Sequence, residues 1–336
     1  MAIVVAIVAV VIALVVLLPG LASLREKFEG GQPGWLVFAA VLQVLSCASY
    51  VIAFRTVFCR KMSWRTSTEI GLSELAANSV LSVGGAGGLA LGAWILRRGG
   101  VSGGHIARRT VAFFLLTSLI NVSCLALGGL GLLTGVLPSD ASLVLCLIPL
   151  IAGVAAIAVA LAAGPLTGAL ARRSGWPRVK TVLSTLSEGV GEALFLLRTR
   201  QPALLIGTAG YMLLDVAVLA ACFAAFGTEL PTFGVLLVAY ILGQLGGLIP
   251  IPGGLGGTDG GLIGVLVIYG VDAADAAVAV IAYRGVLLAV PAVMGFPALA
   301  ILRRRLREEK HDIAACAPGE EVEVIGRGPV RKPAPA

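Results

Sequence analysis

The sequence predicts an all-helical protein that crosses a membrane several times. Of its 336 residues, 58% are hydrophobic and 13% are charged. The mean hydropathy of +0.99 is far above that of a water-soluble domain. The apolar residues fall in long runs between short charged connections, as membrane-spanning helices require. One stretch breaks this pattern, because GLIPIPGGLGGTDGG at residues 247–261 is rich in Pro and Gly.

This stretch predicts a polar cavity inside the membrane domain. Pro250 and Pro252 lack an N–H donor, and the glycines 253–257 leave the main chain unshielded. Because an unpaired amide in hydrocarbon is costly, irregular backbone at membrane depth must be buried in protein or line a wet cavity. We expect a helix to restart at Thr258 as N-cap, with its free N–H groups and positive dipole end facing the cavity and attracting an anion such as phosphate. Broken helices of this kind mark binding sites in transporters.

We expect about six full spans, plus two glycine-broken hairpins that are either re-entrant or made of short helices. The expected spans are residues 2–18, 35–54, 110–134, 143–170, 202–226 and 276–302. The first lacks the basic start of a secretory signal and is expected to be retained. Residues 1–305 then form an integral membrane domain, and 306–336, rich in Gly, Pro and Glu without periodicity, form a disordered cytoplasmic tail.

The two hairpins are flanked by charges of opposite sign. The first, residues 69–96, breaks at SVGGAGG and lies between basic clusters, whereas the second, residues 233–269, has acidic flanks. By the positive-inside rule the first opens to the cytoplasm and the second to the outside, with both termini cytoplasmic in a bacterial-type plasma membrane. Two related units inserted from opposite faces would form an inverted repeat, with the substrate site where the breaks meet. Chance similarity in a chain with 44 glycines is the alternative.

Residues 176–200 show helical periodicity, with apolar positions on one side and charged or hydroxyl residues on the other. This pattern predicts an amphipathic helix lying in the inner interface. A solvated helix packed on the cytoplasmic face explains the same pattern, and both interpretations stay open.

Asp215 and Arg284 are the ionisable groups deepest in otherwise apolar spans, where a charge needs a partner or a water-filled cavity. Arg284 suits a headgroup phosphate because its planar fork donates two parallel hydrogen bonds. Asp215 would then be its counter-ion, or a proton or cation site, and a purely structural ion pair is the alternative. Asp259 either complements the dipole of the restarted helix or binds a cationic group or proton.

Four further polar residues have less specific roles. Glu69 and Glu74 lie near a predicted membrane edge, so we expect solvated ends. Asn78 and Gln244 precede the two breaks and are more typical of interhelical hydrogen bonds than of ligands.

Several functional classes are not expected. The basic residues cluster between apolar runs, which the positive-inside rule explains without a nucleic-acid partner. His105 and His311 are far apart, so we expect no metal, and the cysteines suggest small core residues without a disulfide framework. No nucleophile–base set, ATP-type phosphate loop or Mg²⁺-binding carboxylate pair is recognisable. We therefore expect no enzyme activity and no cofactor.

PIPGGLGGTDGG at residues 250–261, followed by AYRGVLLAVPAVMG at 282–295, resembles the lysylphosphatidylglycerol synthase transmembrane-region family. The resemblance covers roughly residues 10–302. It implies a membrane region like the one with which the multiple-peptide-resistance synthases translocate lysyl-phosphatidylglycerol between leaflets. Family members tend to have a proline, and often an arginine, around the first glycine break, and this chain has neither there. Only 34 residues follow Leu302, too few for an aminoacyl-transfer domain, so lysyl transfer is not expected.

The resemblance carries over to Pro252, Gly253, Gly254, Gly256 and Arg284, with Asp259 standing where Glu is usual. The full set of expected substrate-binding residues is Pro252, Gly253, Gly254, Gly256, Gly257, Thr258, Asp259, Arg284, Tyr283, Asp215, Asn78 and Gln244.

The leading hypothesis is a lipid translocase that moves a phospholipid or polyprenyl-phosphate headgroup. One alternative is a membrane subunit that anchors, or supplies lipid to, a glycosyltransferase or another lipid-processing synthase. Another is an ion-coupled transporter of a small solute, favoured if Asp215 rather than Arg284 proves indispensable. A membrane lipid is the expected partner, and the sequence leaves the lipid, the direction, the energy source and the oligomeric state open.

Overall fold

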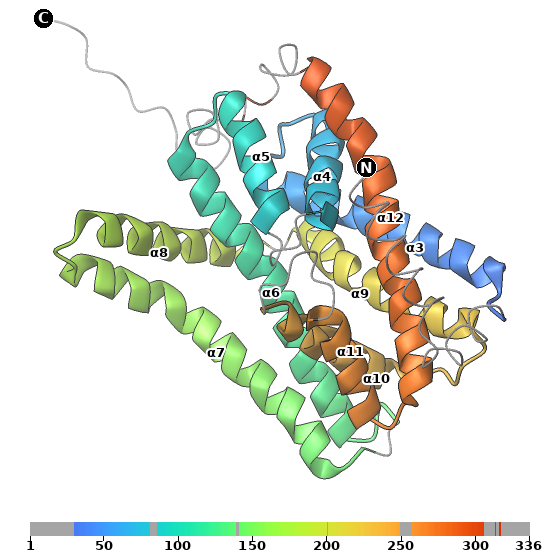
Figure 1. The fold of residues 1–336 in the computed structure, drawn as a ribbon. Coiled ribbons are helices and arrows are strands. Elements are labelled where there is room, and N and C mark those ends of the chain that lie inside the picture. The colour runs from blue at the N-terminus through green and yellow to red at the C-terminus, as the bar shows by residue number, and fades with distance from the viewer. Residues whose placement is uncertain are drawn as a thin grey trace, which may run out of the picture.

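The structure is a computed structural model that describes residues 30–80, 86–138, 141–199, 201–248 and 257–305, together with Ile313 and Cys316. Within these ranges the chain forms ten α-helices and one short 3-10 helix, and no strand (Figure 1). The expected span at 2–18 and almost all of the expected tail at 306–336 lie outside the described residues. The all-helical fold class is confirmed.

Among the described residues, five helices are long and apolar enough to cross a membrane, and they contain the other five expected spans to within one residue at their ends. They are α3 (Pro33–Phe58), α6 (Gly103–Leu133), α7 (Leu143–Arg173), α9 (Pro202–Ala225) and α12 (Ala273–Arg305). Both α3 and α9 begin with a proline, which fits the first helical turn because the N–H that it lacks would have no intrahelical acceptor. This architecture is that of a polytopic membrane protein.

Each of the two expected hairpins consists of two short helices that pack on each other. The first is α4 (Trp64–Val80) with α5 (Ala86–Arg98); the second is α10 (Phe233–Gly243), the 3-10 helix η2 (Gln244–Leu248) and α11 (Gly257–Ile268). Residues 81–85 and 249–256, which hold most of both glycine breaks, lie outside the described residues. With 13 residues in α5 and 12 in α11, each second arm is too short to span a bilayer.

The helices pack as two interlocked copies of one unit, α3–α6 and α9–α12. The contact of α4 with α12 corresponds to that of α10 with α6, and the contact of α5 with α6 corresponds to that of α11 with α12. Helices α3 and α9 pack against each other and run antiparallel, since Gln32 N–H, at the start of α3, donates to the carbonyl of Ala225, at the end of α9, over 2.7 Å. This pairing pattern is the one that an inverted repeat produces.

One end of the bundle is basic. Arg109 near the start of α6 donates to the carbonyl of Val57 near the end of α3, over 2.7 Å. At the same end, Arg305 of α12 lies 4.0 Å from Glu69 of α4. Arg109 and Arg305, from two of the expected positive clusters, therefore lie at one end of the bundle, here called the basic face.

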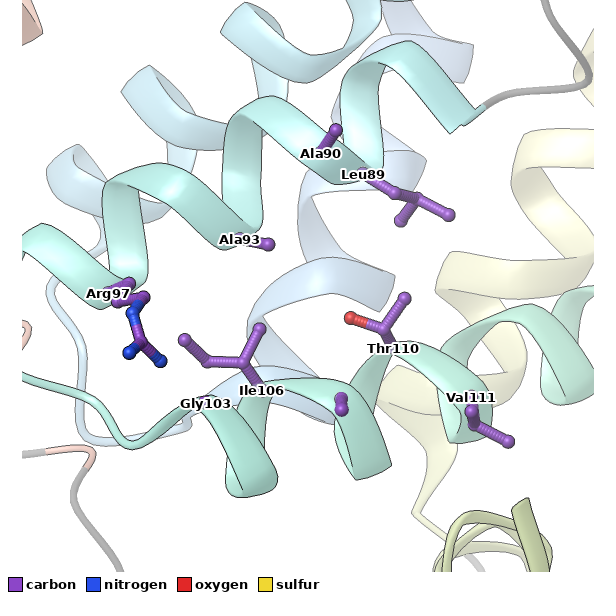
Figure 2. A pocket seen from close by; sticks show the side chains of 9 residues that line it. Leu89, Ala90, Ala93, Arg97, Gly103, Ile106, Thr110 and Val111 are labelled. Atoms are coloured by element: carbon purple, nitrogen blue, oxygen red, sulfur yellow. The ribbon is translucent and has the colours of Figure 1, made fainter. Parts of the chain in front are cut away.

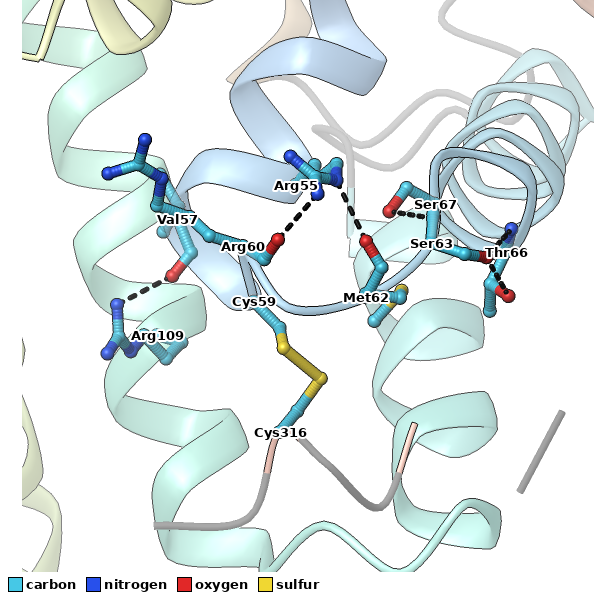
Figure 3. The surroundings of a disulfide bond; sticks show 10 residues. All are labelled: Arg55, Val57, Cys59, Arg60, Met62, Ser63, Thr66, Ser67, Arg109 and Cys316. Carbon is cyan, nitrogen blue, oxygen red and sulfur yellow. Dashed lines mark hydrogen bonds between the residues drawn. A yellow bond between two sulfur atoms is a disulfide. The ribbon is translucent and has the colours of Figure 1, made fainter. Parts of the chain in front are cut away.

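A disulfide on this face corrects the expectation that the cysteines form no disulfide. Cys59, directly after α3, is bonded to Cys316 across 257 residues of sequence (Figure 3). Ile313, fully buried, packs against Gly99 at the end of α5. The bond holds one residue of the expected tail against the α3–α4 connection, and a separation of this length gives no signal in sequence spacing.

Helix α8 (Pro177–Arg198) covers the region expected to be amphipathic. It packs on α6 and α7, and its Glu192 pairs with Arg109 over 3.0 Å. Several apolar side chains of this region remain exposed, among them Trp176 just before α8, Val179, Val182 and Phe195. In a membrane protein such a surface suits lipid. The interfacial helix and the helix packed on the cytoplasmic face both stay predictions.

Candidate functional site

The second hairpin is closed by backbone lying directly on backbone. A Cβ at Gly243 would come within 2.8 Å of Leu262 Cα, and one at Gly246 would collide with the carbonyl oxygen of Gly257. Only glycine permits this approach, which brings the end of α10 against the start of α11. The expected site residues Pro252, Gly253, Gly254 and Gly256 lie between these points but outside the described residues.

A charged pair stands at the start of α11. The Nε of Arg284, on α12, lies 3.3 Å from Oδ1 of Asp259, in the first turn of α11. The side chains are only 13% and 18% exposed, respectively, so the pair is largely withdrawn from the surface. Asp259 thus complements the helix dipole and also binds a cationic group, which is Arg284 of its own chain. Thr258 beside it is half-buried and Gly257 is buried.

Asp215 does not take the role of carboxylate partner to Arg284. It is 2% exposed, and Ser46 on α3 and Tyr240 on α10 donate to its two oxygens over 2.6 and 3.1 Å. Tyr283 is also buried, at 3% exposure, and its hydroxyl has no hydrogen-bond partner among the described residues. The structure therefore separates two polar centres that the sequence suggested were one.

In the first hairpin a side chain closes the break. Asn78 Oδ1 on α4 accepts from Gly88 N–H on α5 over 2.6 Å. Gln244, its expected counterpart, is exposed at the start of η2. Asn78 therefore makes the structural contact that the sequence favoured.

The expectation that Glu69 and Glu74 have solvated ends is wrong, because both are buried, at 7% and 1% exposure. Tyr50 on α3 donates to Glu74 Oε2 over 2.7 Å, and the carboxylate lies directly on Gly92 of α5. The error arose because α4 packs lengthwise on α12, so its middle is in the interior and not at an edge of the membrane.

An apolar groove runs beside the first hairpin (Figure 2). It consists of two adjoining cavities of about 470 and 370 Å³, one between α5 and α6 and the other bounded also by α7 and α8. Arg97 stands at one end of the groove, and Leu89, Thr110 and Val111 line both cavities. Its remaining lining residues are mostly small or aliphatic: Ala90, Ala93, Gly103, Ile106, Ala107, Phe114, Leu115, Ala163, Thr167, Leu186 and Val190.

Comparison with known proteins identifies the family. Residues 1–295 match the sequence profile described as "Lysylphosphatidylglycerol synthase TM region". The chain belongs to the lysylphosphatidylglycerol synthase transmembrane-region family. No curated protein matches the chain. The matched range of this family member includes both hairpins, the Asp259–Arg284 pair and Asp215, so the resemblance inferred from residues 250–261 and 282–295 is confirmed.

Sequence reasoning missed the polar face of α3 in this family member. Gln43, Ser46 and Tyr50 are 1%, 0% and 5% exposed, and their spacing of three and four residues puts them on one side of the helix. That periodicity was visible in the sequence. Polar residues on one face of an otherwise apolar span are a signal for an interior polar contact.

Proposed function

We propose that this protein translocates a membrane lipid whose headgroup carries a phosphate, a phospholipid or a polyprenyl phosphate. The observation that carries the proposal is the Asp259–Arg284 pair, held at the first turn of α11 directly after the glycine break. A charged pair inside a membrane domain is costly and is typical of a substrate pathway.

The pair offers a phosphate-bearing headgroup two complementary groups. When the pair opens, the guanidinium fork of Arg284 can bind a phosphate in bidentate fashion. Asp259 would then stay at the positive end of the α11 dipole, which partly compensates its charge. A zwitterionic headgroup fits as well, because its cationic group can bind Asp259 while its phosphate binds Arg284.

The groove along α5 and α6 gives an acyl or prenyl chain a place to lie. Its two cavities are lined almost wholly by apolar side chains, and a lipid chain gains favourable dispersion contacts in such a groove. Arg97 at one end lies near the basic face, where it can attract an anionic headgroup. The groove thus suits the apolar chain of a lipid.

We further propose transport without chemical conversion of the lipid, in the plasma membrane of a bacterial-type cell and with the basic face cytoplasmic. The charge distribution supports this orientation through the positive-inside rule. A partner synthase or glycosyltransferase would act on the lipid before or after its transfer.

The test is leaflet exchange in vesicles reconstituted with the full chain. Fluorescent phosphatidylglycerol and a fluorescent polyprenyl phosphate serve as probes, and dithionite bleaches whichever label is in the outer leaflet. We expect Arg284→Ala to slow exchange about tenfold to a hundredfold, because a charge-assisted hydrogen bond contributes about 1.5–3 kcal/mol. Arg284→Lys should exchange lipid at a rate between those of the wild type and Arg284→Ala, since lysine keeps the charge but cannot form two parallel hydrogen bonds.

Gly285→Ala is the matched control, because a Cβ there meets nothing within 4 Å. It should exchange lipid at the wild-type rate. Wild-type vesicles that exchange neither probe faster than empty vesicles would refute translocation. Co-purification of a lipid-processing enzyme that survives Arg284→Ala would then support the membrane-subunit alternative.

A further inference from the structure

A second polar centre, at Asp215, is not used by the proposed headgroup site. Asp215 lies in the middle of α9, a membrane span, and is 2% exposed. Its hydrogen-bond donors in the described part of the chain are all neutral: the hydroxyls of Ser46 and Tyr240 and the side-chain amide of Gln43. An ionisable side chain inside a span without an opposite charge beside it is a candidate functional site.

The surroundings of Asp215 can satisfy it in either protonation state. Ser46 Oγ lies 2.6 Å from Asp215 Oδ1 and 3.2 Å from the carbonyl oxygen of Tyr211. When Asp215 is ionised, the Ser46 hydroxyl donates to the carboxylate. When Asp215 is protonated, its O–H can donate to Ser46 Oγ, while the Ser46 hydroxyl turns to the Tyr211 carbonyl. No buried group loses its partner in either state, which is what a reversible proton site requires.

The same face of α3 leads to a second buried carboxyl group, Glu74. Tyr50 lies one turn beyond Ser46 and donates to Glu74 over 2.7 Å. Tyr211 stands between the two centres: its ring packs edge-on against Tyr50 with centroids 5.3 Å apart, and it precedes Asp215 by one turn of α9. Tyr50 is nearer than Ser46 to the end of α3 on the basic face, so the Glu74 centre lies closer to that face than the Asp215 centre does.

We propose that Asp215 and Glu74 are two proton-binding sites within the membrane core, each held by hydroxyl groups of neighbouring helices. When a site binds a proton, one O–H bond forms on its carboxyl group, and that bond breaks when the proton leaves; the neighbouring tyrosines stay neutral. If the protein translocates a lipid as proposed above, these sites identify a proton gradient as the energy source, and that part of the inference rests on the proposed function.

Other ionisable groups surround Asp215, but none in the described ranges forms an ion pair with it. Those within electrostatic range are Cys47 on α3, Tyr211 on α9, Tyr240 on α10 and Tyr283 on α12, the last of which also senses Arg284. Glu74 faces Tyr50 on α3 and the backbone of Gly92 on α5. A sodium ion fits poorly at Asp215, because both carboxylate oxygens already accept from hydroxyls and a hard cation needs several free oxygen ligands.

Infrared difference spectroscopy of the full chain in nanodiscs, between acid and alkaline pH, tests the two proton sites directly. We expect two pH-dependent carbonyl bands from protonated carboxyl groups, one removed by Asp215→Asn and the other by Glu74→Gln. Tyr50→Phe should shift the Glu74 band, because it removes the hydroxyl bond. Thr208→Val is the matched control: Thr208 is a buried hydroxyl on α9 that bonds its own helix at Leu204, and its loss should change neither band.

Coupling is tested in the lipid-exchange vesicles. A gradient of one pH unit corresponds to about 1.4 kcal/mol, so each coupled proton should shift the steady-state distribution of lipid between leaflets up to about tenfold. Asp215→Asn should abolish this shift, and Ser46→Ala should weaken it if the asparagine variant does not fold.

The possible failures are distinguishable. Bands that persist in both carboxyl variants, or an Asp215 band abolished by replacing potassium with sodium at constant pH, overturn the proton sites. If the pH gradient does not change the distribution of lipid between leaflets, proton coupling is refuted but translocation is not. If the infrared bands behave as expected but the vesicles show no lipid exchange, the proton sites are supported and the proposed function is refuted.

Discussion

The two hairpins have the same outline but are closed by different means. In α4–α5 a side chain makes the closure, with Asn78 accepting from Gly88 and the Glu74 carboxylate filling the space over Gly92. In α10–α11 the closure is main chain on main chain, with Gly246 against Gly257, and a charged pair follows it. The first hairpin thus closes with its polar side chains, whereas the second leaves them next to the break.

This difference agrees with the interlocked packing. Each hairpin's first arm lies along the last helix of the other unit, α4 on α12 and α10 on α6. If one hairpin moves, the packed helix of the other unit therefore has to shift or repack. The first hairpin, which side chains hold closed, suggests a fixed half of the protein. The second hairpin, where backbone packs on backbone, suggests the half that binds substrate.

The largest loss of stability is expected from a substitution that breaks the backbone closure of the second hairpin. Gly246→Ala should destabilise the protein by about 3 kcal/mol, because the new Cβ meets a carbonyl that cannot turn away. Gly92→Ala should cost about 1 kcal/mol, because its obstacle is the end of the Glu74 side chain, which can rotate. Equilibrium unfolding of the detergent-solubilised protein in SDS measures both.

A second substitution separates the two mechanisms. Adding Glu74→Ala to Gly92→Ala should recover part of the lost stability, since it removes the obstacle. The comparison is wrong if Gly246→Ala proves the milder of the two single changes.

Replacing the side-chain amides that precede the two breaks should change stability unequally, but by less than Gly246→Ala does. Asn78→Leu removes the acceptor of the buried Gly88 N–H and should cost about 1–3 kcal/mol. Gln244→Leu, at an exposed position, should change stability by no more than about 0.5 kcal/mol. The same SDS titration compares them, and equal losses would mean that Gln244 also closes a break.

Much of the fold was predictable because hydropathy reports it directly. The apolar runs placed α3, α6, α7, α9 and α12, and glycine and proline placed both breaks. In hydrocarbon the backbone has few alternatives to helix. The lengths of the apolar runs and the positions of glycine and proline therefore suffice to predict where the helices begin and end.

The pairings across helices were not predictable, because they depend on how helices pack. Arg284 and Asp215 were the two deepest charges in the sequence, yet Arg284 pairs with Asp259, on a short helix that hydropathy places only approximately. Glu74 was assigned to an edge, and Cys59 had no visible partner at position 316. Each error concerns a partner on another helix, which the order of residues along the chain does not specify.

The smallest expected effect concerns an open glycine in the second hairpin. Gly260 follows Asp259, is exposed, and has nothing within 4 Å of an added Cβ. Gly260→Ala should therefore raise stability by up to about 1 kcal/mol, because alanine favours helix. If the space beside Asp259 admits the headgroup, the same change should slow lipid exchange despite the added stability. Gly264→Ala, one turn further along α11 and also without neighbours, should stabilise the protein similarly and leave exchange unchanged. Equal exchange rates in both variants would place the headgroup elsewhere and leave the second hairpin no more functional than the first.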